Sequence, residues 1–504
     1  MNSYPSNRAF GLRSGGRPAA ILLAASATIL MIASLEPISA ILALVAVAAI
    51  ILNLTRPQLG IYIILAFFAC IEEYPVSLVE GSERWVRTPF YSRSLFLKGL
   101  YLPDLIIVLA IVSWLVYFVA VKRPFRFRNP LASAHIALLG VMIVSVFLYL
   151  LRTSFLAKPV LYNVNTLGMV MRGSAVGMIA FAQMKAFLTM LVIYYLVLNY
   201  AQDARSIKRM VIFLFVLFAL TLGQGLVRLA LHPMAFFRTG ASLFYDFASS
   251  YLFATALVFF IVFIFMGKRS PGERWALFIG AFLCGVMVLL SLRRTVWLST
   301  ALTLAFLVLI YFPASRKIKL LFWTTCLGIV CVVGYDAWNA KKDYFKAVSE
   351  RISGTGLSED STLYRALIYS NAGRMIVRHP LLGYGAEPLW NDFVTFRRFR
   401  QTYEGVHSLY LWVIFRFGAL GLAVWLWLLA VFFRKTIPAA KAMSDPFLKA
   451  TMISLIMAVL LFVLISFFVP TYAMLRFTVI GGIFMALAMQ CRRLGQPGPE
   501  GGLL

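Results

Sequence analysis

Long apolar runs without a charged residue constrain this chain more than any other feature of its sequence. Four of them span 105–121, 247–266, 275–292 and 452–469. A helix needs about 20 such residues to cross the hydrocarbon core of a bilayer, and lipid offers no partner for an unpaired backbone group. None of the runs shows the period-two alternation of a barrel strand. They therefore predict an all-α integral membrane protein.

Composition agrees with this class and limits the kinds of partner that we expect. Hydrophobic residues make up 62% of the chain, whereas soluble domains are close to half apolar. A net charge of +28 would suggest nucleic acid for a soluble protein, but basic cytoplasmic loops explain it in a membrane protein. We therefore expect membrane lipid, and no nucleic acid, as a partner. The five cysteines have neither metal-ligand spacing nor the pattern of a disulfide framework.

The apolar runs predict about fourteen transmembrane helices by their length. The first run follows Arg8, Arg13 and Arg17 as in a signal peptide, but a second run comes almost at once, so we expect an uncleaved first helix. The expected spans are 19–35, 37–53, 58–72, 103–121, 131–151, 178–200, 210–231, 247–266, 275–292, 295–312, 320–335, 408–432, 450–469 and 476–490.

The distribution of basic residues predicts the orientation. With the N-terminus placed in the cytoplasm, every cytoplasmic loop contains Lys or Arg, as the positive-inside rule requires, and both termini are cytoplasmic. These loop residues are Arg56; Lys122, Arg123, Arg126 and Arg128; Arg205, Lys208 and Arg209; Lys268, Arg269 and Arg274; Arg316, Lys317 and Lys319; Arg434, Lys435 and Lys441; and Arg492 and Arg493.

We expect one polytopic domain over 1–504 with a disordered cytoplasmic tail at 494–504. Of the outer segments, 336–407 is too long for a structureless connection, so it is predicted to hold short helices and a function. Ser361–Val377 is a candidate for one of them.

Arginines on the predicted outer face break the charge rule. Arg293 and Arg294 lie in a turn between two apolar runs, where arginine is costly and is usually functional or paired. The alternative is a pair that snorkels to the interface. Arg238 follows another short outer segment, and for this residue ordinary headgroup contact is an equal alternative.

The large loop is rich in arginine, including Arg365, and ends where the chain re-enters the membrane at His407. An imidazole at a helix start near Glu404 can accept a proton near neutral pH. His379 is expected instead to shape a turn before Pro380.

Several arginines at a membrane interface favour a phosphate ligand, because the guanidinium fork matches its geometry and stays charged. A lipid-linked pyrophosphate fits, since its head lies at that depth and its tail lies in the bilayer. There is no Asp-x-Asp motif and no acidic cluster suited to a divalent metal. We therefore expect no metal and no cofactor, with arginines stabilising the leaving pyrophosphate.

The motifs resemble those of the bacterial O-antigen ligase/polymerase superfamily. The resemblance is carried by Arg365, by Arg378-His-Pro-Leu-Leu-Gly-Tyr-Gly385 and by His407-Ser-Leu-Tyr-Leu-Trp412, followed by Phe417-Gly-Ala-Leu-Gly421. Ser291-Leu-Arg-Arg294 and Phe237-Arg-Thr-Gly-Ala241 resemble two earlier elements of the family.

This resemblance implies a metal-independent, inverting glycosyltransferase at the periplasmic face of the bacterial inner membrane. Its donor would be a glycan on undecaprenyl diphosphate, and its acceptor lipid A–core (a ligase) or a second lipid-linked glycan (a polymerase). Arg238, Arg365 and either Arg293 or Arg294 would hold the diphosphate, with a slight preference for Arg293. His407 would activate or orient the acceptor hydroxyl.

Two positions depart from the family pattern. Ser408 stands where the family has asparagine, and Arg416 stands where it has glutamate. Both departures put the local hydrogen-bond pattern in question while leaving His407 and the arginines in place.

The alternative function is a transporter or flippase of lipid-linked sugars. Such a protein should carry polar or broken helices near the bilayer midplane. The expected spans are nearly free of charge, with Lys185 at an undetermined depth and Arg228 near an outer end. Polar residues gathered on one face favour the enzyme. Nothing in the sequence favours a receptor.

Overall fold

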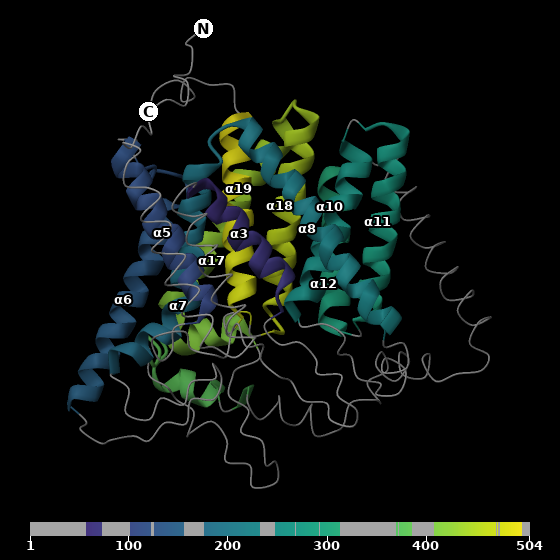
Figure 1. The fold of residues 1–504 in the computed structure, drawn as a ribbon. Coiled ribbons are helices and arrows are strands. Elements are labelled where there is room, and N and C mark those ends of the chain that lie inside the picture. The colour runs from purple at the N-terminus through teal and green to yellow at the C-terminus, as the bar shows by residue number, and fades with distance from the viewer. Residues whose placement is uncertain are drawn as a thin grey trace, which may run out of the picture.

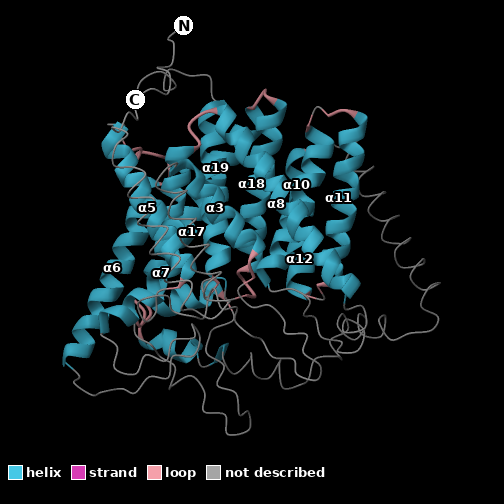
Figure 2. Ribbon diagram, in the orientation of Figure 1, coloured by secondary structure: helices cyan, strands magenta, loops and turns pink. Residues whose placement is uncertain are grey.

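The computed structural model is a bundle of long helices (Figure 1). It describes residues 57–72, 101–121, 125–155, 176–231, 247–267, 269–291, 293–312, 369–370, 372–385, 408–469, 471 and 474–495. These ranges contain no strand (Figure 2). The helices are α3 Pro57–Cys70, α5 Leu102–Val121, α6 Ala132–Phe155, α7 Val176–Tyr200, α8 Ala204–Leu231, α10 Phe247–Met266, α11 Pro271–Leu290, α12 Arg294–Tyr311, α17 Leu409–Ala442, α18 Pro446–Ile465 and α19 Leu475–Gly495.

Each of these helices coincides with an expected span. Seven of those in the described part of the chain are long and apolar enough to cross a membrane, and shorter apolar helices accompany them. The all-α prediction is therefore confirmed for the described residues. The expected spans 19–35, 37–53 and 320–335 lie outside those residues.

The predicted end of α17 was wrong by ten residues. The span was expected to stop at residue 432, but the helix continues to Ala442 because its packed face continues through Thr436, Ala439 and Ala440, all of which are buried. Arg434, Lys435 and Lys441 consequently lie on the last turns of a helix rather than in a loop.

Short connections make neighbouring helices antiparallel. Residues 267–270 join α10 to α11, 291–293 join α11 to α12, and 443–445 join α17 to α18. We call the end of the bundle at the α11–α12 turn the lower end, as it is drawn in Figure 1. The starts of α10, α12, α17 and α19 and the ends of α3, α8, α11 and α18 lie at this end.

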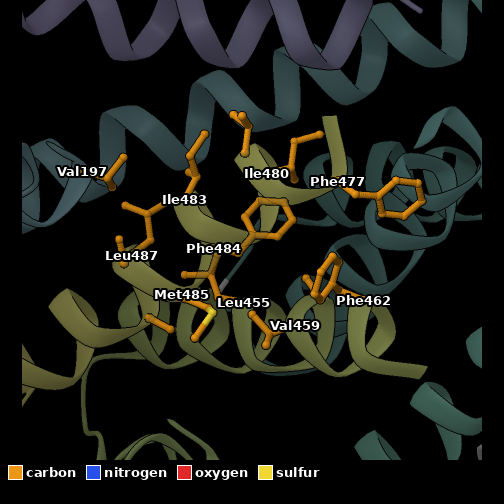
Figure 3. Close-up of a cluster of buried hydrophobic side chains, with 14 of the residues drawn as sticks. Val197, Leu455, Val459, Phe462, Phe477, Ile480, Ile483, Phe484, Met485 and Leu487 are labelled. Atoms are coloured by element: carbon orange, nitrogen blue, oxygen red, sulfur yellow. The ribbon is translucent and has the colours of Figure 1, made fainter. Parts of the chain in front are cut away.

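Helix α18 is the centre of the bundle. Its residues from Ala450 to Val459 are all buried, and it packs directly against α10, α12, α17 and α19. Figure 3 shows Leu455, Val459 and Phe462 of α18 against the apolar face of α19. Helices α10, α12, α17 and α19, which begin at the lower end, are thus held around one shared neighbour.

Helix α19 packs tightly against α7 at one of two adjacent glycines. A Cβ atom at Gly482 would lie 2.7 Å from the carbonyl oxygen of Met190, which is too close for any side chain. A Cβ atom at Gly481 would lie 3.8 Å from the ring of Phe462, which is ordinary contact. Gly482 is therefore required by the α7–α19 interface, whereas Gly481 is not.

We expect Gly482→Ala to lower the thermal unfolding midpoint of the purified protein, because overpacking costs about 1–3 kcal/mol. Gly481→Ala is the matched control, and it should leave the midpoint unchanged or raise it, since alanine favours a helix by about 1 kcal/mol over glycine. Equal midpoints for the two variants would contradict the close approach of α7 and α19.

Candidate functional site

The α11–α12 turn buries Arg293. Ser291 ends α11 and donates its hydroxyl to the carbonyl of Val288 at 2.6 Å, and the indole of Trp297 donates to the same carbonyl at 2.8 Å. These bonds hold the turn against α11. Arg293 is the N-cap residue of α12, and only 7% of its surface is exposed. A guanidinium inside the protein does not fit the snorkelling alternative, which places the charge in solvent.

Arg294 is the first residue of α12, and the structure describes its backbone only. Arg238, Arg365 and His407 lie outside the described residues. The roles that the sequence predicts for these four residues remain predictions.

The residue after His407 is fixed in place at the lower end. Ser408 caps α17, with its hydroxyl oxygen accepting from the backbone N–H of Leu411 at 3.4 Å. The N–H of Leu409 donates to the carbonyl of Ser466 at the end of α18, at 2.9 Å. Serine and asparagine both cap helices well, so this departure from the family pattern preserves the cap. The chain at His407 therefore leads directly into a buried, anchored helix start.

Helix α17 is broken at Gly418, where φ is +65° and ψ is −167°. The segment 380–385 fills the break. Ala419 N–H donates to the carbonyl of Pro380 at 2.7 Å, and Tyr384 N–H donates to the carbonyl of Phe415 at 3.0 Å. The Pro-Leu-Leu-Gly-Tyr-Gly motif is thus a docking segment that pairs its backbone with the interrupted helix.

Glycine is required on both sides of this junction. A Cβ atom at Gly418 would lie 2.2 Å from the carbonyl oxygen of Leu381, and one at Gly383 would lie 2.6 Å from the backbone of Arg416. Both residues also have a positive φ, which is costly for any other residue. The close spacing of the two backbones explains why the family-like motifs contain these glycines.

Arg416 is buried and bonds to the same junction from inside the protein. Its surface is 2% exposed, its Nη1 donates to the carbonyl of Gly385 at 3.2 Å, and its guanidinium carbon lies 5.7 Å from the ring centroid of Phe415. The arginine that replaces the family's glutamate therefore contacts the docking segment. The expected turn at His379 is also observed, with Gly383 N–H donating to its carbonyl at 3.0 Å.

An apolar cavity of about 190 Å³ lies beside the junction, between α6 and α17. Its chemistry suits a length of hydrocarbon rather than a sugar or a phosphate. It is lined by Gly140, Val141, Val144, Ser145, Leu382, Phe417 and Leu420.

The sequence interpretation missed a buried ionic chain at the lower end. Arg476, at the start of α19, is fully buried and donates to the carbonyls of Phe68 and Ala69 at the end of α3, both at 2.7 Å. Glu72 accepts from Arg228 of α8 at 2.7 Å and from Ser249 of α10 at 3.0 Å. Opposite charges at the outer ends of separate spans were the available signal, but sequence does not show which of them meet.

A second ion pair shows the partner of Lys185, whose depth the sequence left open. Lys185 of α7 pairs with Asp104, and its Nζ lies 5.7 Å from the ring centroid of Tyr101. Asp104 is in the first turn of α5, at the lower end. The charge of Lys185 on α7 is therefore balanced by a carboxylate of α5.

The elements that carry the candidate residues converge on α18. Helix α12, which begins at Arg294, and helix α17, which begins two residues after His407, both pack against it. Helix α10, which follows the connection containing Arg238, does so as well. Helices far apart in sequence thus pack against one shared neighbour.

Comparison with known families finds a match for one region of the chain. Residues 279–426 match the family model described as O-antigen ligase. This match supports the resemblance to the O-antigen ligase/polymerase superfamily. The match covers the α11–α12 turn, Arg365, His407 and the Gly418 junction, and the segment around Arg238 lies before it. A search of curated proteins found no match.

Gly418→Ala tests the docking of segment 380–385 on α17. We expect a lower unfolding midpoint and a large loss of any transfer activity, because a left-handed backbone costs about 1–3 kcal/mol for a residue other than glycine and the added Cβ would displace Leu381. Gly373→Ala is the control, since nothing lies within 4 Å of its Cβ position. A Gly418→Ala protein with unchanged stability and activity would contradict the junction.

Proposed function

We propose that this protein is a metal-independent, inverting glycosyltransferase that moves a glycan from undecaprenyl diphosphate to an acceptor hydroxyl at the periplasmic face of the bacterial inner membrane. The match to the O-antigen ligase model supports a membrane ligase or polymerase that acts on lipid-linked glycans. The donor, the mechanism and the side of the membrane are our inference.

The observation that carries the proposal is the burial of Arg293 at the lower end of α18, where the chain that follows His407 is also anchored. A preorganised guanidinium can stabilise charge that develops on a departing diphosphate. Arg238, Arg365 and Arg294 are the further donor contacts that we propose. His407 would accept the proton of the acceptor hydroxyl, or orient that hydroxyl, as attack on the anomeric carbon inverts its configuration.

The charge distribution of the bundle supports the proposed orientation. The upper end carries most of the described basic residues, as expected for a cytoplasmic face. The lower end would then face the periplasm, where the glycan donor is presented. The basic residues of the upper end include Arg126, Arg128, Arg205, Lys208, Arg209, Arg269, Arg274, Arg434, Lys435, Lys441, Lys449, Arg492 and Arg493.

The ion pair of Lys185 weakens the transporter alternative. That alternative needs charged groups that face a substrate near the midplane, whereas Lys185 is paired with Asp104 of α5.

Arg293→Ala tests the proposed diphosphate contact, and His407→Ala tests the proposed base. With purified protein and a lipid-linked glycan, we expect kcat to fall about 10²–10³-fold for Arg293→Ala and about 10²–10⁴-fold for His407→Ala. Arg374→Ala is the control, because this arginine is exposed on helix 372–378. Full activity of either site variant would remove its proposed role.

The same assay tests the metal-free mechanism and the acceptor. We expect the initial rate to be unchanged by a chelator, because arginines would stabilise the leaving diphosphate. Loss of activity that added metal restores would contradict the mechanism. Transfer to lipid A–core identifies a ligase, and transfer to a second lipid-linked glycan identifies a polymerase.

A further inference from the structure

The apolar cavity between α6 and α17 has a buried floor and an exposed rim. Of its lining residues, Phe417 and Ser145 are only 1% and 2% exposed, whereas Val144, Leu382 and Leu420 are 44%, 42% and 49% exposed. Apolar side chains that are exposed on a bundle of membrane-spanning helices face lipid tails. We propose that this cavity binds an acyl chain of a phospholipid from the surrounding bilayer.

One face of α6 leaves room for such a chain. Gly140, Val141, Val144 and Ser145 all line the cavity, and residues four apart lie on the same face of a helix. Nothing lies within 4 Å of the position that a Cβ atom would take at Gly140. The glycine therefore leaves space at the cavity that a larger side chain would fill.

The opposite wall comes from docking segment 380–385 and from α17 on either side of its break. Gly385 of this segment lies directly against α6, since a Cβ atom at this residue would be 2.8 Å from the carbonyl oxygen of Ser145. Helices α6 and α17 also pack against each other. The cavity is thus enclosed by three elements that are already in contact around it.

The lining is suited to hydrocarbon. It contains no charged residue, and its one polar side chain, Ser145, has a buried hydroxyl. An apolar cavity of about 150 Å³ stays dry and holds a benzene molecule, so a cavity of about 190 Å³ can hold a short length of acyl chain. The rest of the chain would lie along the exposed apolar residues of α6, which include Leu139, Ile143 and Phe147.

The abundance of phospholipid decides between the possible chains. The occupancy of a site rises with the concentration of its ligand, and acyl chains are the main component of the hydrocarbon to which this cavity opens. An apolar cavity that stays empty destabilises a protein in proportion to its volume. A bound acyl chain would therefore stabilise the packing of segment 380–385 against α6 and α17.

Photo-crosslinking tests the proposal without requiring glycan transfer. The probe is a phosphatidylcholine with a diazirine in one acyl chain, mixed into phosphatidylcholine nanodiscs that hold the full-length protein, and adducts are mapped by mass spectrometry. We expect adducts to be concentrated on residues 140–145 and 417–420. Gly140→Leu should reduce them about tenfold, because its side chain would displace about two CH₂ groups of the lipid.

Gly285→Leu on α11 is the matched control. Its Cβ position is also free of atoms within 4 Å, and Gly285 does not line the cavity. Both substitutions replace a helical glycine, so their gains in helix propensity are equal, and Gly285→Leu should leave the adducts unchanged. Gly140→Ala fills less of the cavity and should give an intermediate loss, which guards against a folding defect in the leucine variant.

Thermal unfolding in detergent gives an independent measurement. Without added lipid, Gly140→Leu should have a higher midpoint than Gly285→Leu, because the leucine replaces contacts that the empty cavity lacks. Added phosphatidylcholine should raise the midpoint of wild type and Gly285→Leu more than that of Gly140→Leu. Equal rises in the three proteins would contradict a lipid in this cavity.

Two crosslinking results would overturn the proposal. Adducts spread evenly over the lipid-facing helices, with no excess at the cavity, would show ordinary contact with surrounding lipid only. Adducts that undecaprenyl phosphate displaces, but that excess phosphatidylcholine does not, would assign the cavity to a polyprenyl chain instead of an acyl chain.

Discussion

The packing of four helices around α18 is the constraint on which the rest of this structure depends. Its buried apolar surface contacts α10, α12, α17 and α19, as Figure 3 shows for α19. Within lipid, helix association depends on close packing and on polar contacts between helices. Both are present here, because glycine allows α19 to approach α7 and the Arg476–Glu72 chain links α3, α8, α10 and α19. The lower end therefore has a defined geometry on which a chemical site can be built.

A broken helix beside this packed centre accommodates the family motifs. Gly418 interrupts α17, and the freed backbone groups are bonded by segment 380–385. Irregular backbone is tolerated at membrane depth only where protein provides its partners. The motif glycines thus make the break possible, and the rigid start of α17 follows His407 directly. The break at Gly418 and the proposed base His407 therefore lie close together in the sequence.

Sequence predicted the spans well because apolar length is a property of contiguous residues. The limits of α10 were predicted correctly, and those of α3 and α5 were predicted to within two residues.

Other features could not be predicted from contiguous residues. The end of α17 was missed because the buried face of the helix, rather than its mean hydropathy, determines where the helix ends. The Gly418 break was missed because it requires contacts with residues more than thirty positions away. Glu72 and Arg476 were missed because each resembles an ordinary charge at a span end until their partners are known. Two arginines in a short turn violate the charge rule locally, which is why the sequence singles out Arg293, and the structure shows that this residue is buried.

The most direct test is an experimental structure of the protein with undecaprenyl diphosphate bound. The account predicts the diphosphate at the lower end of α18, within hydrogen-bonding distance of the Arg293 guanidinium and beside the chain that leads into Ser408. A diphosphate bound at the upper end, or enclosed midway through the bundle, would contradict a site at the lower end and would favour transport over transfer.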